Sequence, residues 1–316
     1  MRPVIAACAA LVVAGAAAAQ AQSWRPPADN QRCPSRWGPA DERGAANLLG
    51  PETVLRAARL IRTGEVIELG RVLRGSMPLS AGRRFQLDTK RTTMNPQGNR
   101  RGSNEEIVTA EIGQVGTQFD GFAHQTIGDS LYNCFKLDDI STRTGFTKLG
   151  IQNVGAVVTR GVLIDVAAYK AVTVLPDTYE ITVEDLQRAL ASEKMTLQPG
   201  DAVIINTGWG TLWEKDNARY GRANPGIGVA AAEWLARQSP VLVGADTPPV
   251  EVSPNPDAQL SLPVHQIMLV INGIHTLENL KLDVLAATRA YEFAFIVQPL
   301  KIEGGTGSTV APIAIR

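Results

Sequence analysis

The sequence predicts a single α/β domain. Three short apolar runs, at 155–166, 201–206 and 241–245, have the length and composition of buried strands. Helical patterns lie between them, and strands that alternate with helices are typical of α/β domains. Residues 22–316 are enough for one large domain, and no linker requires a second one.

The helices follow from local signals. Thr182 and Asp185 have the spacing of a capping box, which predicts a helix that begins there and runs through Ala191. Trp234 and Leu235 give the segment 229–238 an apolar face, which predicts a second helix. We also expect a helix at 52–61, helical turns at 263–271 and 279–288, and strands at 65–73 and 293–302.

The segment 76–104 is polar, basic and rich in Gly, Pro and Asn, and it therefore predicts a long surface loop. Loops of this length often cover or shape a site, although mobility alone explains the composition equally well. An irregular N-terminal arm at 33–51 precedes the first predicted helix.

The N-terminus has the pattern of a secretory signal peptide. Arg2 precedes an apolar, alanine-rich stretch, and Ala19-Gln20-Ala21 resembles a cleavage site. The stretch is shorter than the roughly 20 residues of a membrane span, so we expect residues 1–21 to be cleaved and the protein to be periplasmic or secreted. Two cysteines remain, Cys33 and Cys134, which could pair or stay as free thiols.

Charge and composition exclude some partners. Lys+Arg and Asp+Glu number 31 each, and no polybasic run indicates nucleic acid. No second apolar span indicates a membrane. A small neutral or weakly charged molecule is the expected ligand.

The chain has 3 histidines, and the first follows Gln114, Gln118 and Asp120. The even spacing places these three side chains on one face of a strand, but a straight strand would hold the glutamines about 13 Å apart. They converge only if the chain bends, and Gly116 allows a bend. The alternative is a polar strand end whose aspartate caps a turn before His124.

A second polar segment contains His265, His275 and Glu278. Imidazole and carboxylate are the usual ligands of a catalytic divalent ion. Taken alone, His265 fits a helix residue with a satisfied hydrogen bond equally well, and His275 fits a structural role better.

Several motifs in a fixed order resemble one family, the cyclases that include bacterial kynurenine formamidases and isatin hydrolases. The similarity covers most of residues 22–316. Its motifs are Trp37-Gly38, Gly116-Thr117-x-x-Asp120-x-x-x-His124, Gly161 to Asp165, Gly200-Asp201 to Thr207-Gly208-Trp209, Gly244-Ala245-Asp246-Thr247, Glu278-Asn279-Leu280 and Pro299 to Ser308.

The resemblance implies a mixed β-sheet flanked by helices (a swivelling β/β/α fold), a homodimer or larger homo-oligomer, and hydrolysis of an amide or lactone carbonyl with a divalent metal. It implies that Asp120, His265 and Glu278 bind the metal and that His124 transfers protons. Gln114 and Gln118 replace two metal-binding histidines of the family. An amide oxygen is a poorer zinc ligand than imidazole and suits Mn²⁺ better. We therefore expect Mn²⁺ or Zn²⁺ as the ion, with the two glutamines as assisting ligands.

The substrate stays open at this stage. An arylformamidase-like activity follows from family analogy, whereas export argues against a substrate of cytoplasmic tryptophan breakdown. The alternatives are an exported, metal-free binding protein and a lactone-forming cyclase or dehydratase. The aromatic residues available to line a pocket or to fill the core are Trp37, Phe85, Phe119, Phe122 and Trp209.

Overall fold

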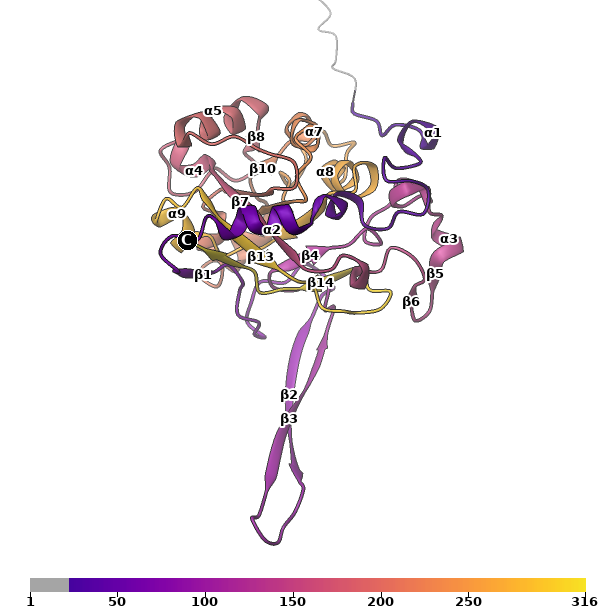
Figure 1. Ribbon diagram of the computed structural model, residues 1–316, viewed down its shortest axis with the longest axis vertical. Coiled ribbons are helices and arrows are strands. Elements are labelled where there is room, and N and C mark those ends of the chain that lie inside the picture. The colour runs from indigo at the N-terminus through magenta and orange to yellow at the C-terminus, as the bar shows by residue number, and fades with distance from the viewer. Residues whose placement is uncertain (1–22) are drawn as a thin grey trace, which may run out of the picture.

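The computed structural model describes residues 23–316, which form one α/β domain around a nine-stranded sheet (Figure 1). Its four central strands are parallel, and the outer strands pair antiparallel, which confirms the predicted mixed sheet. The predicted signal peptide, residues 1–21, lies outside the described residues. Across the sheet the order is β1 (Val66–Glu68), β15 (Ile313–Ile315), β13 (Glu292–Val297), β7 (Val157–Asp165), β9 (Ala202–Asn206), β11 (Leu242–Ala245), β12 (His275–Glu278), β4 (Gln118–Asp120) and β14 (Gly307–Thr309).

The three apolar runs form the central strands β7, β9 and β11 because both faces of the sheet are covered. In β9, Val203 and Ile205 enter one core cluster, and Ala202 and Ile204 enter a second cluster on the opposite face. Side chains alternate along a strand, so burial on both faces requires a continuous apolar run.

Helices pack on the sheet as the sequence patterns predict. Leu186 and Leu235 bring the helices α5 (Val183–Glu193) and α7 (Val229–Arg237) into the first core cluster. Thr182 and Asp185 form the predicted capping box. The α-helices are α1 (Asp29–Arg32), α2 (Pro51–Ala58), α3 (Leu137–Ile140), α4 (Val166–Tyr169), α5 (Val183–Glu193), α6 (Asn217–Arg222), α7 (Val229–Arg237), α8 (Pro263–His265) and α9 (Asp283–Ala287).

Shorter elements complete the domain. The 3₁₀ turns are η1 (Gly44–Leu48), η2 (Tyr132–Cys134), η3 (Ile151–Asn153) and η4 (Trp209–Leu212), and η5 (Gln266–Ile271) is a π-helix. Two small sheets pair β5 (Ser141–Thr142) with β6 (Gly145–Phe146) and β8 (Glu180–Ile181) with β10 (Gly226–Ile227). No helix within residues 23–316 is long and apolar enough to cross a membrane.

The prediction of a long surface loop at 76–104 is largely wrong. Instead, β2 (Phe85–Thr93) and β3 (Gly102–Ala110) form a long antiparallel ribbon that projects from the domain (Figure 1). Both faces of the ribbon meet water, so its strands contain polar residues throughout and lack the apolar alternation that marks a half-buried strand. Leu87 and Val108 face each other across it and are both exposed.

Other element boundaries differ from the predictions. The strand expected at 65–73 ends at Glu68, and Arg71 donates its backbone N–H to the Thr117 hydroxyl. The strand expected at 293–302 ends at Val297. Of the helical turn expected at 279–288, only 283–287 is helical.

Cys33 and Cys134 form a disulfide, which settles the alternative left open by the sequence. The bond joins the start of the N-terminal arm to η2, across 101 positions of the chain.

Candidate metal centre

The pairing of β4 with β12 builds the floor of the site. This register places Glu278 opposite Gln118 and Thr276 opposite Asp120. Gln118 Nε2 donates to Glu278 Oε2 at 2.7 Å, and Thr276 Oγ1 donates to Asp120 Oδ2 at 2.6 Å. All four side chains are buried. Two acidic groups from distant parts of the sequence are thereby fixed on adjacent strands.

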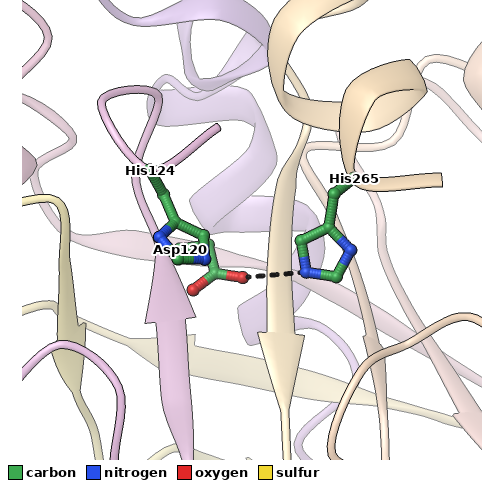
Figure 2. A group of neighbouring side chains, drawn as sticks. All are labelled: Asp120, His124 and His265. Atoms are coloured by element: carbon green, nitrogen blue, oxygen red, sulfur yellow. Dashed lines mark ion pairs between the residues drawn. The ribbon is translucent and has the colours of Figure 1, made fainter. Parts of the chain in front are cut away.

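The chain turns directly after Asp120. Gly121 has no space for a side chain, because a Cβ there would lie 2.9 Å from the Thr306 carbonyl oxygen. His124 closes the turn by donating its backbone N–H to Gly121 O at 3.1 Å. The turn returns the His124 side chain over the end of β4, next to Asp120 (Figure 2).

His265 reaches the site from the opposite side, on the turn α8. Its Nδ1 lies 2.5 Å from Glu251 Oε1, and the Glu251 carboxylate also accepts the backbone N–H groups of Val264 and His265 at 3.0 Å each. These bonds leave Nε2 3.0 Å from Glu278 Oε1 and 3.7 Å from Asp120 Oδ2 (Figure 2 shows the second pair). Glu251 therefore orients His265 toward the two carboxylates.

The charges of this cluster favour a bound cation. Burial and the nearby Asp120 charge raise the pKa of Glu278 to about 7. Burial alone would lower the pKa of His265, but its bonds to Glu251 and Glu278 raise it well above its usual range. Within residues 23–316, Asp120 Oδ1 and Glu278 Oε1 are buried and make no hydrogen bond, although Glu278 Oε1 forms an ion pair with His265. Two carboxylates, each with one oxygen that makes no hydrogen bond, and an imidazole fit a divalent ion. Such an ion would supply the positive charge that a proton on His265 otherwise provides.

His124 lies within the same cluster. One ligand atom each from Asp120, His124 and His265 lie within 4.8 Å of one another. Gln114 contacts His124, with 3.2 Å between Gln114 Nε2 and His124 Nδ1. Burial lowers the pKa of His124, so the ring is neutral near pH 7.

The two glutamines converge because the chain bends at Gly116, whose φ is +66°. Gln118 Nε2 lies 3.5 Å from Gln114 Oε1, whereas a straight strand would hold the two Cα atoms about 13 Å apart. Gln118 turns its amide nitrogen to Glu278, and Gln114 turns its own to His124. In this arrangement they are hydrogen-bond partners of the cluster, and their role as assisting ligands stays a prediction.

His275 lies outside the cluster. Its Nδ1 donates to the Asp120 carbonyl oxygen at 2.9 Å, and its ring stacks on Phe122 with 4.2 Å between centroids. Burial lowers its pKa to about 4. The structural role that the sequence favoured for His275 therefore agrees with its contacts.

Two neighbouring hollows at the cluster share five lining residues, and together we call them the site cavity. One part is lined by His124, His265 and Glu278, and the other by Met77, Leu79, Val115 and Tyr220. Residues shared by both parts are Ser80, Arg83, Gln118, Gly221 and Pro248.

The aromatic residues expected at a pocket do not line the site cavity. Phe119, Phe122 and Trp209 are fully buried in the core. Trp37 is partly exposed and lines a separate hollow beside the disulfide. Phe85 packs at the base of the β2–β3 ribbon.

Sequence reasoning missed three residues at the site: Glu251, Thr276 and Arg83. Glu251 had a usable signal, because it is a single carboxylate between two valines in a proline-flanked apolar stretch. A carboxylate in such a setting is buried only with partners. Thr276 and Arg83 carry no comparable signal.

A family model described as "Putative cyclase" matches residues 55–252. A solved structure described as a novel cyclase is 33% identical, with a TM-score of 0.79, and the match covers 89% of this chain and 98% of that one. The chain belongs to the cyclase family.

Isatin hydrolases share the fold of this cyclase-family chain. Isatin hydrolase A from Ralstonia solanacearum is 24% identical with a TM-score of 0.56, covering 80% of this chain and 92% of its own. Isatin hydrolase A from Labrenzia aggregata, solved with benzyl benzoate, is 20% identical with a TM-score of 0.59, and the match covers 82% of this chain and 94% of that one. No curated protein matches the chain by sequence.

Proposed function

We propose that this cyclase-family protein is a metal-dependent hydrolase that adds water to an amide or lactone carbonyl. The observation that carries the proposal is that Asp120 and Glu278 both approach Nε2 of the buried His265, at 3.7 and 3.0 Å, and that His124 clusters with Asp120 and His265. Membership of the cyclase family and the shared fold with isatin hydrolases support it.

Asp120, His265 and Glu278 would hold the ion, which is Mn²⁺ or Zn²⁺. A bound divalent ion supplies Lewis-acid chemistry, which polarises a carbonyl and makes water more acidic. Glu251 and Thr276 keep His265 and Asp120 in position through hydrogen bonds to their other atoms.

His124 would take a proton from water and return one to the leaving group. A neutral ring is required for the first step, and the lowered pKa of His124 supplies it. The Gln114 carboxamide offers both a donor and an acceptor, so by rotating it can bond Nδ1 in either ring tautomer. The Nε2 atom of His124 then remains available to the substrate whether the ring is neutral or protonated.

The finer proposal is an arylformamidase-like enzyme that acts outside the cytoplasm. Met77, Leu79, Val115 and Tyr220 offer an apolar wall that suits an aromatic ring. The Cys33–Cys134 disulfide supports export to an oxidising compartment.

Metal content and turnover test the proposal together. Protein purified without chelator should contain a divalent metal in near-stoichiometric amount, and a panel of aryl formamides and aryl lactones should identify the bond it cleaves. Asp120→Ala should remove the metal and turnover, whereas Asp88→Ala on the exposed ribbon should change neither. Protein that contains no metal and takes up none from added Mn²⁺ or Zn²⁺ would favour the metal-free binding protein.

A further inference from the structure

Arg83 occupies a distinctive position in the site cavity. It is one of five residues that line both parts, so it lies between the ligand cluster and the part that contains Met77 and Leu79. A molecule whose ring contacts Met77 and Leu79 and whose carbonyl meets the cluster would pass the Arg83 side chain. Arg83 is therefore placed to contact a substituent that lies between the ring and the carbonyl.

The guanidinium of Arg83 is largely unused by the protein. Its Nη1 donates to the Gln114 carbonyl oxygen at 3.1 Å, and within residues 23–316 no carboxylate lies within 4.0 Å of it. Nearby arginines are paired, Arg84 with Glu111 at 4.0 Å and Arg222 with Asp177 at 3.4 Å. A guanidinium has five N–H donors, so Arg83 keeps several for a ligand.

The charges around Arg83 also favour an anionic ligand. Without an ion, the positive charge of Arg83 partly offsets the carboxylates of the cluster, because Arg83 and Glu278 line the same part of the site cavity. A divalent ion would neutralise Asp120 and Glu278. Glu251 already accepts three hydrogen bonds on the far side of His265. Glu111 would remain close enough to the half-buried Arg83 for the Arg83 charge to lower its pKa, but Glu111 also pairs with Arg84 at 4.0 Å. A ligand anion can therefore supply a counter-charge that Arg83 does not share.

We propose that Arg83 binds a carboxylate of the substrate, so that the preferred substrates are aromatic amides or lactones that carry a carboxylate beside the scissile group. This inference rests on the proposed hydrolase function. A carboxylate is the anion that matches the planar fork of a guanidinium, with two parallel N–H···O bonds.

The test compares formanilide with 2-, 3- and 4-formamidobenzoate, which differ from it only by the carboxylate. The wild type should prefer at least one formamidobenzoate. Arg83→Gln should lower kcat/KM for that compound by roughly 10- to 100-fold, mainly through KM, and change formanilide turnover little, since a hydrogen bond to a charged group is lost. Arg83→Lys should recover part of the loss, and Arg84→Gln, on the exposed neighbour, should match the wild type.

An equal loss for formanilide and the formamidobenzoates would overturn the proposal, because Arg83 would then act on the common carbonyl. Calorimetric binding of aminobenzoates and of aniline to the Mn²⁺-loaded protein separates this failure from failure of the hydrolase function. Aminobenzoate binding that Arg83→Gln weakens roughly tenfold would support the carboxylate site even if no amide is hydrolysed. Aminobenzoates that bind no more tightly than aniline would refute it.

Discussion

Glu251 Oε1 lies 2.5 Å from His265 Nδ1, and this contact directs the other ring nitrogen of His265 at the acidic pair Asp120 and Glu278. Because the same carboxylate accepts two backbone N–H groups of the turn, both the ring and the backbone that carries it are fixed by one side chain. A ligand oriented in this way loses little conformational freedom when it binds an ion.

We expect Glu251→Gln to weaken metal binding by about 10- to 100-fold, which is the usual effect of losing a partner that orients a ligand. The neutral amide keeps the size of the side chain but no longer holds His265 with a charge. Competition with a fluorescent chelator would measure the affinity for Mn²⁺ and Zn²⁺. The control is Glu184→Gln on the exposed surface of α5. An unchanged affinity in the Glu251 variant would show that the backbone alone positions His265.

Replacement of His124 should separate chemistry from metal binding. His124→Ala should lower kcat by about 10²- to 10⁴-fold, the usual contribution of a proton-transfer residue, while metal content stays near that of the wild type. Elemental analysis and steady-state kinetics on one preparation would give both quantities. Loss of the metal in this variant would instead make His124 a ligand, which its position beside Asp120 and His265 also permits.

The contrast between predicted and unpredicted features has a physical basis. The strands β7, β9 and β11 could be predicted because their burial on both faces requires apolar residues. The β2–β3 ribbon could not, since strands that meet water on both faces have no apolar alternation to detect.

The site shows a similar limit. Asp120 and His265 stand in recognisable motifs, but their partners Thr276 and Glu251 are set by the strand register and by the packing of α8. Contacts between residues far apart in the chain leave no local pattern in a single sequence. The convergence of Gln114 and Gln118 was an intermediate case, because Gly116 indicated where a bend was possible without requiring one.

Reduction of the Cys33–Cys134 bond should destabilise the domain. The bond spans 101 positions of the chain, and cross-links that close long loops restrict the unfolded chain most, with typical effects of about 2–4 kcal/mol. Urea unfolding with and without reductant would measure this loss. The Cys33→Ser/Cys134→Ser variant should resemble the reduced wild type and be insensitive to reductant. Equal midpoints for the oxidised and reduced wild type would contradict the prediction.

Glu193, at the end of α5, should make stability depend on pH near neutrality. Its Oε1 accepts the Asp165 backbone N–H at 2.8 Å, and within residues 23–316 its buried Oε2 has no hydrogen-bond partner. Burial and the Asp165 charge raise its pKa from 4.5 to about 7. Between these two values the folded protein binds more protons at this site than the unfolded chain does, so its contribution to stability falls as the pH rises.

The Glu193→Gln variant keeps the acceptor for Asp165 and has no charge to bury. Its melting temperature relative to the wild type should therefore increase as the pH rises from about 4.5 to 7 and should level off above that range. Thermal unfolding of both proteins over this range, in one buffer series, would measure the difference. Glu184→Gln, an exposed change on the same helix, should show no such trend. A pH-independent difference for Glu193→Gln would mean that the carboxylate is solvated or paired in the folded protein, and burial would then not control its charge.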